Sequence, residues 1–193
     1  MRKGRGAFPV EFEARFSFFA VLGFLVCTDR DGVSLMCAGA CLLHELGHLA
    51  VMLIEKRPPD GIVLYGGGIH IRGGSTSFPA ASAGVAVNTA LFLLCGLIPW
   101  ESRDIRLFGV VNLLIAAFNL LPFGELDGKL MLDRSLTMAF TPQTAVRVSE
   151  ICERLVPAIL VPAVIVLAFT GFLNFSAVIF LIYVLAVEIP EKI

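Results

Sequence analysis

Charged residues are scarce in this sequence. Asp, Glu, Lys and Arg make up 16% of the 193 residues, whereas a soluble domain of this length carries about 25%. The deficit is concentrated in long apolar runs, and the mean hydropathy is +0.85. The bilayer is therefore the expected solvent. Because the net charge is only −1 and there is no basic patch, we expect no nucleic-acid partner.

Two other patterns are missing. The chain has no CxxC pair, and its cysteines lie in or beside apolar runs, so they are expected to be small packing residues rather than a disulfide framework; they are Cys27, Cys37, Cys41, Cys95 and Cys152. Residues 1–16 carry positive charge but no short apolar core followed by a small-residue cleavage site. We therefore expect no removable signal peptide.

Apolar runs recur along the chain. A transmembrane helix needs roughly 20 largely apolar residues, with about 17 as a working minimum. The sequence predicts six such helices, the first and last of them short, at about 16–28, 33–54, 80–100, 107–123, 155–172 and 174–189.

The basic residues give these helices a direction. With the N-terminus inside, 12 of the 15 Lys and Arg residues fall on the cytoplasmic side, and the other side holds only Arg30, Arg103 and Arg106. Such an excess follows the positive-inside rule. We predict a multi-pass protein of the cell membrane whose N-terminus is cytoplasmic.

Some stretches are not helical in pattern. Residues 10–16 alternate apolar and polar side chains, the period of a strand, and residues 61–75 form two β-rich runs around three glycines, which predicts a hairpin. Non-helical backbone at membrane depth must be buried in protein or line a wet cavity. Residues 124–154 are the longest polar connection, and a helix is expected from Thr141 on the cytoplasmic surface.

These features together predict the fold. We expect an all-α polytopic membrane protein with a small Gly-rich, membrane-associated β-hairpin. No linker, repeat or second domain is visible, so residues 1–193 are expected to form a single transmembrane domain.

Two of the three histidines form a motif. HELGH at residues 44–48 lies inside the predicted span 33–54. Residues four apart share a helix face, so His44 and His48 can reach one metal ion. Glu45 points about 100° away in projection, where it can take a proton from an attacking water. A solvated helix is the alternative, but ionisable groups within a span are costly and usually functional.

A zinc hydrolase needs three protein ligands and one open position. The best source of the third ligand is NLLPFGELDG at residues 119–128, after the predicted span 107–123. Asp127 supplies an oxygen ligand, Gly128 frees the backbone beside it, and Pro122 ends the helix so that the carboxylate can turn inward.

The predicted orientation tests this pairing. The span that carries HELGH and the span that precedes Asp127 both run towards the cytoplasm. His48 lies about 9 Å from the cytoplasmic end of its span, at about 1.5 Å per residue. Since the orientation was derived from charge alone, the common depth of the two half-sites is independent support. The active-site end is therefore expected to be cytoplasmic.

The two motifs together resemble the site-2 protease family of intramembrane zinc metalloproteases. Size and the six-span layout are most similar to the small branch that includes the sporulation factor protease, and the resemblance covers nearly the whole chain. It implies one zinc ion per chain, held by His44, His48 and Asp127, with Glu45 as catalytic base. It also implies that Asn119 holds the substrate backbone.

Other segments follow the family less closely. AGVAVN at residues 83–88 is similar to the family's AGPxxN segment, but Val85 replaces the proline, which leaves the role of Asn88 open. The hairpin matches the family's membrane-associated β element. We assign Gly67 and Gly68 to substrate binding, because an unpaired strand edge there can hold an extended substrate. The chain has room for neither a PDZ nor a CBS domain.

Four other residues have competing interpretations. Cys41 is a poor zinc ligand, because its short thiol lies one turn beyond the histidines, and helix packing is preferred. His70 is expected to face solvent or the cavity rather than to be a spare ligand. Glu125 is interpreted as a solvated loop carboxylate, and Asn112 as a polar contact between helices.

The sequence thus predicts an intramembrane zinc metalloendopeptidase that acts in regulated intramembrane proteolysis. Its expected partners are a transmembrane protein substrate and the lipid bilayer, with room for a regulatory membrane protein. The alternative is a catalytically silent membrane protein that keeps the metal site for binding or assembly, although the intact Glu45 favours the enzyme. A transporter ranks last, because charge within the spans is confined to HELGH and the Asp127 end.

Overall fold

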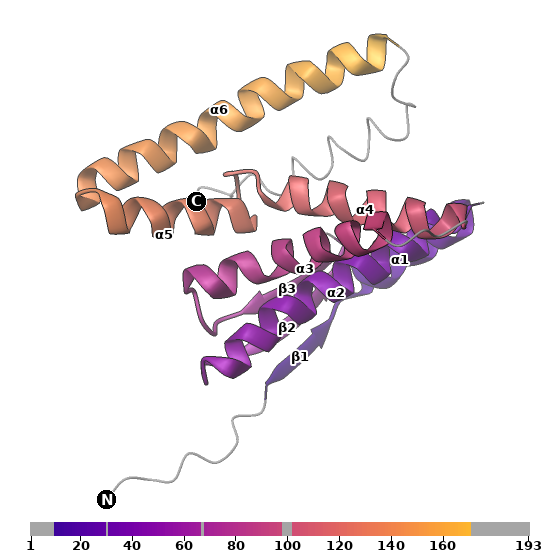
Figure 1. Ribbon diagram of the computed structural model, residues 1–193, viewed down its shortest axis with the longest axis horizontal. Coiled ribbons are helices and arrows are strands. Elements are labelled where there is room, and N and C mark those ends of the chain that lie inside the picture. Colours follow the sequence, from indigo (N-terminus) through magenta and orange to yellow (C-terminus); the bar gives the residue numbers. More distant parts are fainter. Residues whose placement is uncertain (1–9, 30, 67, 98–101, 171–193) are drawn as a thin grey trace, which may run out of the picture. The chain divides into compact units, whose positions relative to one another are not determined.

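The computed structural model describes residues 10–29, 31–66, 68–97 and 102–170, and the structural statements that follow concern these residues. The chain divides into two compact units, Met1–Ala116 and Ala117–Ile193. Figure 1 labels the elements of both units.

The first unit combines apolar helices with a small sheet. Its elements, in chain order, are β1 (Glu11–Ala14), α1 (Phe16–Thr28), α2 (Val33–Ile54), β2 (Gly61–Tyr65), β3 (Gly68–Arg72), α3 (Phe78–Leu97) and most of α4 (Arg103–Asn119). Thus the hairpin β2–β3 is inserted between the long helices α2 and α3.

The sheet has the order β1-β2-β3, with β1 parallel to β2 and β3 antiparallel to β2. The predicted strand and the predicted hairpin are both confirmed. Gly68 opens β3 with φ +131°, a conformation that side chains with a Cβ rarely adopt. Gly67 lies outside the described residues. Within the described part of the chain, β3 pairs on one side only and is therefore an edge strand.

Helices α2 and α3 pack against each other. Gly47 on α2 allows this, because a Cβ there would lie 2.9 Å from the Ala83 carbonyl oxygen and 2.8 Å from Val87 Cγ2. Glycine at a helix contact lets two backbones approach closely, as is common in membrane helix pairs. The glycine of HELGH therefore has a packing role of its own.

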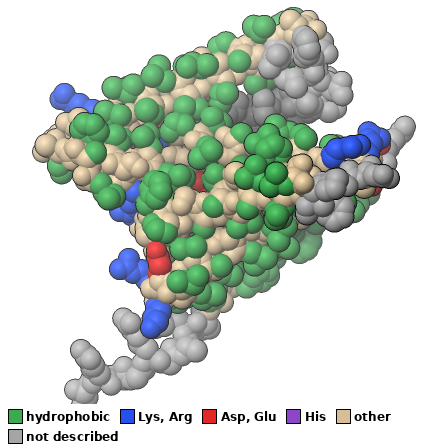
Figure 2. Space-filling model, in the orientation of Figure 1, with side chains coloured by type: hydrophobic (Ala, Val, Ile, Leu, Met, Phe, Trp, Pro, Cys, Tyr) green, Lys and Arg blue, Asp and Glu red, His purple; other side chains and the backbone are tan. Residues whose placement is uncertain are grey.

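Burial on these two helices differs from that in a soluble protein. The polar side chains of His44, His48 and Asn88 are buried, whereas Leu35 and Leu53 of α2 are 62% and 57% exposed. Hydrophobic side chains also cover much of the face shown in Figure 2. Polar groups inside and leucines outside are typical of a chain whose solvent is lipid.

Among the residues that the structure describes, two helices, α2 and α3, are long and apolar enough to cross a membrane, and Phe16–Cys27 of α1 is a shorter apolar segment. Helix α4 covers the predicted run 107–123 as far as Asn119, and α6 covers the predicted run 155–172 as far as Phe169. The run 174–189 lies outside the described residues. The count of six spans therefore stays a prediction.

The second unit contains the last turn of α4, then α5 (Asp127–Ala139) and α6 (Pro142–Phe169). Helix α5 was not predicted, because its mixed polar sequence lacks a long apolar run. Helix α6 joins the predicted surface helix and the following span into one element that continues through two prolines. Asp133 of α5 accepts hydrogen bonds from Lys129 Nζ at 2.7 Å and from Ser149 Oγ of α6 at 2.5 Å.

Candidate metal centre

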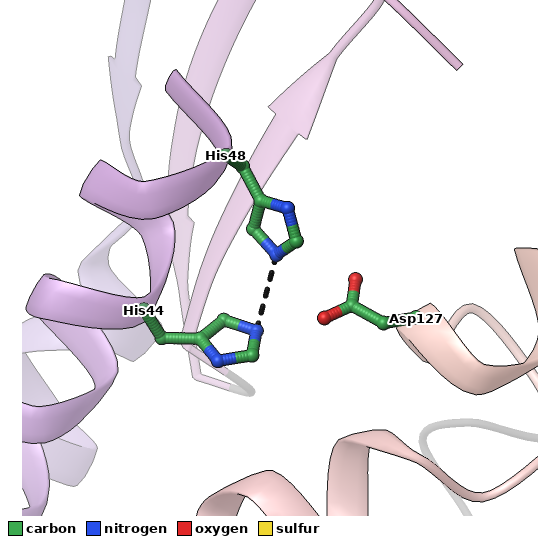
Figure 3. A group of neighbouring side chains, drawn as sticks. All are labelled: His44, His48 and Asp127. Carbon is green, nitrogen blue, oxygen red and sulfur yellow. Dashed lines mark hydrogen bonds between the residues drawn. The ribbon is translucent and has the colours of Figure 1, made fainter. Parts of the chain in front are cut away.

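The two histidines of HELGH lie on one face of α2 and are almost fully buried. His44 is 3% exposed and His48 is 6% exposed. Their Nε2 atoms are 3.1 Å apart, as the dashed line in Figure 3 marks. The spacing of four residues therefore brings both imidazoles together, as the sequence predicted.

The other ring nitrogen of each histidine is held by α3. His48 Nδ1 lies 2.7 Å from the Ala80 carbonyl oxygen, which can only accept, so this nitrogen donates. His44 Nδ1 lies 3.2 Å from Asn88 Oδ1 and donates to it in the same way. The amide nitrogen of Asn88 in turn donates to the Ala40 carbonyl oxygen at 3.5 Å, which fixes the orientation of the amide.

Oxygen acceptors beside both Nδ1 atoms favour the tautomer of each neutral ring that carries its proton on Nδ1. With both Nδ1 atoms protonated, both Nε2 atoms present lone pairs, and two lone pairs 3.1 Å apart repel unless positive charge lies between them. Two imidazoles on one tetrahedral zinc, with Zn–N distances of about 2.0–2.1 Å, have nitrogens about 3.3–3.4 Å apart. The pair therefore fits a shared metal ion, with the hydrogen-bonded second shell that such ligands have.

Gly84 of α3 leaves the space beside this pair open. A Cβ at residue 84 would lie 2.4 Å from His48 Nε2 and 2.5 Å from His44 Nε2. Those distances are close to the length of a metal–imidazole bond, about 2.0–2.1 Å. A methyl group would thus compete for the space that a metal ion held by both histidines needs.

Sequence reasoning left these α3 contributions open or missed them. Asn88 is fully buried and its Oδ1 contacts His44 Nδ1, so the structure places it beside His44 although Val85 replaces the proline of the similar family segment. The motif AGVAVN was the signal for Gly84 and Asn88. The Ala80 carbonyl could not be predicted as a contact of His48, because every residue has a backbone carbonyl.

The remaining predicted residues on α2 and α4 are partly buried. Glu45 follows His44 on α2 and emerges about 100° around the helix from it. Asn119 is the last residue of α4, and the turn after it closes with a bond from Leu121 N–H to the Phe118 carbonyl at 3.0 Å. Helix α4 thus ends three residues before Pro122.

Asp127 is the first residue of α5 in the second unit, and Figure 3 labels its carboxylate. A carboxylate in the first turn of a helix is stabilised by the helix dipole. A Cβ on Gly128 would lie 2.1 Å from the Leu120 carbonyl oxygen. Glycine is therefore required at 128 by the close passage of the preceding backbone, rather than by backbone freedom.

The competing candidates can now be compared with the structure. Cys41 is exposed, so packing within the described part of the chain does not explain it. His70 is partly buried on β3, and Glu125 is exposed as expected. Asn112 is fully buried, but its side-chain nitrogen donates to the Phe108 carbonyl of its own helix at 2.8 Å, so this bond is not the predicted contact between helices.

Comparison with known proteins identifies the fold. No family model matches the sequence, and no curated protein matches it. Among solved structures, the site-2 protease from Methanocaldococcus jannaschii is similar, with a TM-score of 0.62 and 16% sequence identity, over 96% of this chain and 91% of that chain. The chain therefore has the fold of a site-2 protease.

Proposed function

We propose that the chain is an intramembrane zinc metalloendopeptidase that hydrolyses peptide bonds of membrane-embedded proteins. One observation carries the proposal. Two buried histidines of one apolar helix direct Nδ1 to oxygen acceptors on the neighbouring helix and bring their Nε2 atoms to 3.1 Å from each other beside Gly84. Such a costly arrangement inside a candidate span is expected only for a functional site.

His44, His48 and Asp127 are the candidate ligand set for one zinc ion. Two imidazoles and a carboxylate are a ligand set that catalytic zinc sites use with a fourth position open to water. When bound, zinc supplies Lewis-acid polarisation of the scissile carbonyl and acidifies the attacking water.

Proton transfer and substrate binding are assigned to residues of this chain. Glu45 accepts the proton of the attacking water on its carboxylate and delivers it to the leaving amine. Asn119 binds the substrate backbone. We assign Gly67 and Gly68 to substrate binding, with the edge strand β3 holding the unwound substrate as an added strand. Gly68→Pro should then reduce cleavage without removing zinc.

Two observations support a membrane location. The two long apolar helices α2 and α3 support a membrane protein, and the shared fold is that of a protease. We infer a multi-pass protein of the cell membrane with six spans, and with its N-terminus and active-site end on the cytoplasmic side.

The decisive experiment is co-expression with single-span reporter substrates, comparing wild type with Glu45→Gln. Loss of the general base is expected to reduce cleavage about 10²- to 10⁴-fold, while the purified variant keeps its zinc. Glu150→Gln, which changes an exposed carboxylate of α6, is the matched control and should cleave normally.

Two outcomes would contradict the proposal. Undiminished cleavage by Glu45→Gln would remove Glu45 from the chemistry. Zinc bound by wild type without cleavage of any reporter would favour the silent metal-binding alternative.

A further inference from the structure

Glu55 lies directly after the last residue of α2, where its negative charge is unfavourable. The C-terminal end of a helix carries partial negative charge, which an anion opposes. The contacts of Glu55 offset this, because Ser75 Oγ donates a short hydrogen bond to Glu55 Oε2, and Ser77 Oγ donates to Oε1 at 2.6 Å. Both serines lie on the segment that leads into α3.

Ser77 is the residue directly before α3 and caps its first turn. Its Oγ accepts a hydrogen bond from the Ala80 N–H at 3.1 Å, which is the usual role of a serine before the first turn of a helix. Its own N–H donates to Ser75 Oγ at 3.3 Å, and Ser75 is only 3% exposed. One carboxylate thus holds both hydroxyl groups that shape the start of α3.

The next link reaches the metal centre. Ala80, which Ser77 holds by its N–H, uses its carbonyl oxygen to accept the proton of His48 Nδ1 at 2.7 Å. A continuous set of contacts therefore runs from Glu55 through Ser77 and Ala80 to His48. It starts at the residue that follows α2 and returns to α2 at His48, about two helical turns earlier.

Close packing also holds the segment before α3 against the end of α2. Gly74 has φ +82°, and a Cβ there would lie 2.8 Å from Met52 Sδ in the last turn of α2 and 3.2 Å from Pro59 Cα. Met52 is 8% exposed. The segment that bears the two serines is therefore packed closely against the end of α2.

We propose that Glu55 is a positioning residue for the metal centre: through Ser75 and Ser77 it fixes the start of α3 against the end of α2, and so sets the carbonyl that orients His48. This rests on the proposed function, because it assigns His48 to zinc. Glu55 itself touches neither substrate nor metal in this account.

The test is zinc affinity of the purified full chain in detergent, measured by titration against a chelator, with thermal unfolding of the zinc-free protein in parallel. Glu55→Ala should weaken zinc binding about 3- to 10-fold, less than the 10- to 100-fold typical of a direct partner of a ligand. Glu55→Gln keeps an oxygen of the same reach and should stay within about twofold of wild type, in the range of a weak perturbation.

Further variants test whether Glu55 acts through its hydrogen bonds to the two serines or through its charge alone. Glu55→Asp keeps the charge but shortens the side chain, so it should weaken zinc binding as the alanine variant does; wild-type affinity in Glu55→Asp would instead support a purely electrostatic role and overturn the proposal. Adding Glu55→Ala to the double variant Ser75→Ala/Ser77→Ala should weaken zinc binding no further, because both hydrogen bonds of Glu55 are already removed, and a further additive loss would also overturn the proposal.

His44→Ala separates this inference from the proposed function. If wild type binds zinc and His44→Ala does not, while Glu55→Ala binds as tightly as wild type, the positioning role of Glu55 is wrong and the zinc site stands. If His44→Ala binds zinc as wild type does, the proposed site fails, and the inference fails with it.

Discussion

Replacing Gly84 by alanine is the most direct test of the metal centre. The added methyl carbon would lie 2.4 Å from His48 Nε2 and 2.5 Å from His44 Nε2, and 2.6 Å from His44 Cδ2. Ordinary van der Waals contact begins at 3.4 Å. Both imidazoles would therefore have to retreat by about 1 Å, or α3 would have to move away from α2, and overpacking of this kind costs about 1–3 kcal/mol.

The retreat has a second consequence for metal binding. Ligand distances in a metal site are fixed to within about 0.2 Å, so a displacement of about 1 Å takes both nitrogens out of range. We expect zinc affinity to fall at least about 100-fold, which corresponds to about 2.7 kcal/mol. Cleavage should be lost to a similar extent, since His44 and His48 both serve the same ion.

The assay is zinc titration of the purified protein against a chelator, with thermal unfolding measured on the zinc-free sample. Gly96→Ala is the matched control, because it lies on the same helix and a Cβ there meets nothing within 4 Å. The control should bind zinc as wild type does. If Gly84→Ala binds zinc within about threefold of wild type, well inside the range of indirect effects, the geometry inferred for the site is wrong.

Other changes test separate parts of the structure. Asn88→Ala removes the acceptor of the His44 Nδ1 proton and should weaken zinc binding about 10- to 100-fold, whereas Asn88→Asp, which keeps an oxygen there, should recover much of the affinity in the same titration. Gly128→Ala places a methyl group 2.1 Å from a backbone oxygen and should lower the stability of the second unit by about 1–3 kcal/mol, seen as a lower Tm; an unchanged Tm would contradict the close passage. Hydrogen bonds from Ser75 and then Ser77 lower the pKa of Glu55 in the folded protein. The stability this adds is present above the unfolded-state pKa of about 4.3 and is lost as the pH falls through the lower folded-state value, so the Tm difference between wild type and Glu55→Gln should shrink on acidification through that range. A difference that grew on acidification would have the wrong sign.

Much of the site was open to prediction because its geometry is local. The spacing of His44 and His48 puts them on one face of any α-helix, and a helix of leucines that carries two histidines predicts their burial without any knowledge of the fold. The glycines after Tyr65 likewise predicted a hairpin, whose two strands are close in sequence. The alternation in residues 10–16 predicted a strand but not its partner, because Glu11–Ala14 pairs with a strand that follows two intervening helices.

Helix α5 and the unbroken α6 were not predicted, because their patterns are ambiguous in sequence. The run that contains α5 is too polar to indicate a span, and the prolines of α6, Pro157 and Pro162, are usually helix breakers. Packing between neighbouring helices can satisfy backbone groups that proline leaves without a donor. Such compensation depends on neighbours that are distant in sequence.

What the sequence alone determined was the composition of the candidate site: the two histidines, their spacing on α2 and the apolar surroundings. Only the tertiary structure decided how the histidines are held. Asn88 lies 44 residues beyond His44 and Glu55 lies 22 residues before Ser77, and these partners meet because Gly47 and Gly84 let α2 and α3 approach closely. A glycine in a helix does not show from the sequence which neighbour its lack of a side chain admits. The close α2–α3 contact is therefore seen only when both helices are in place.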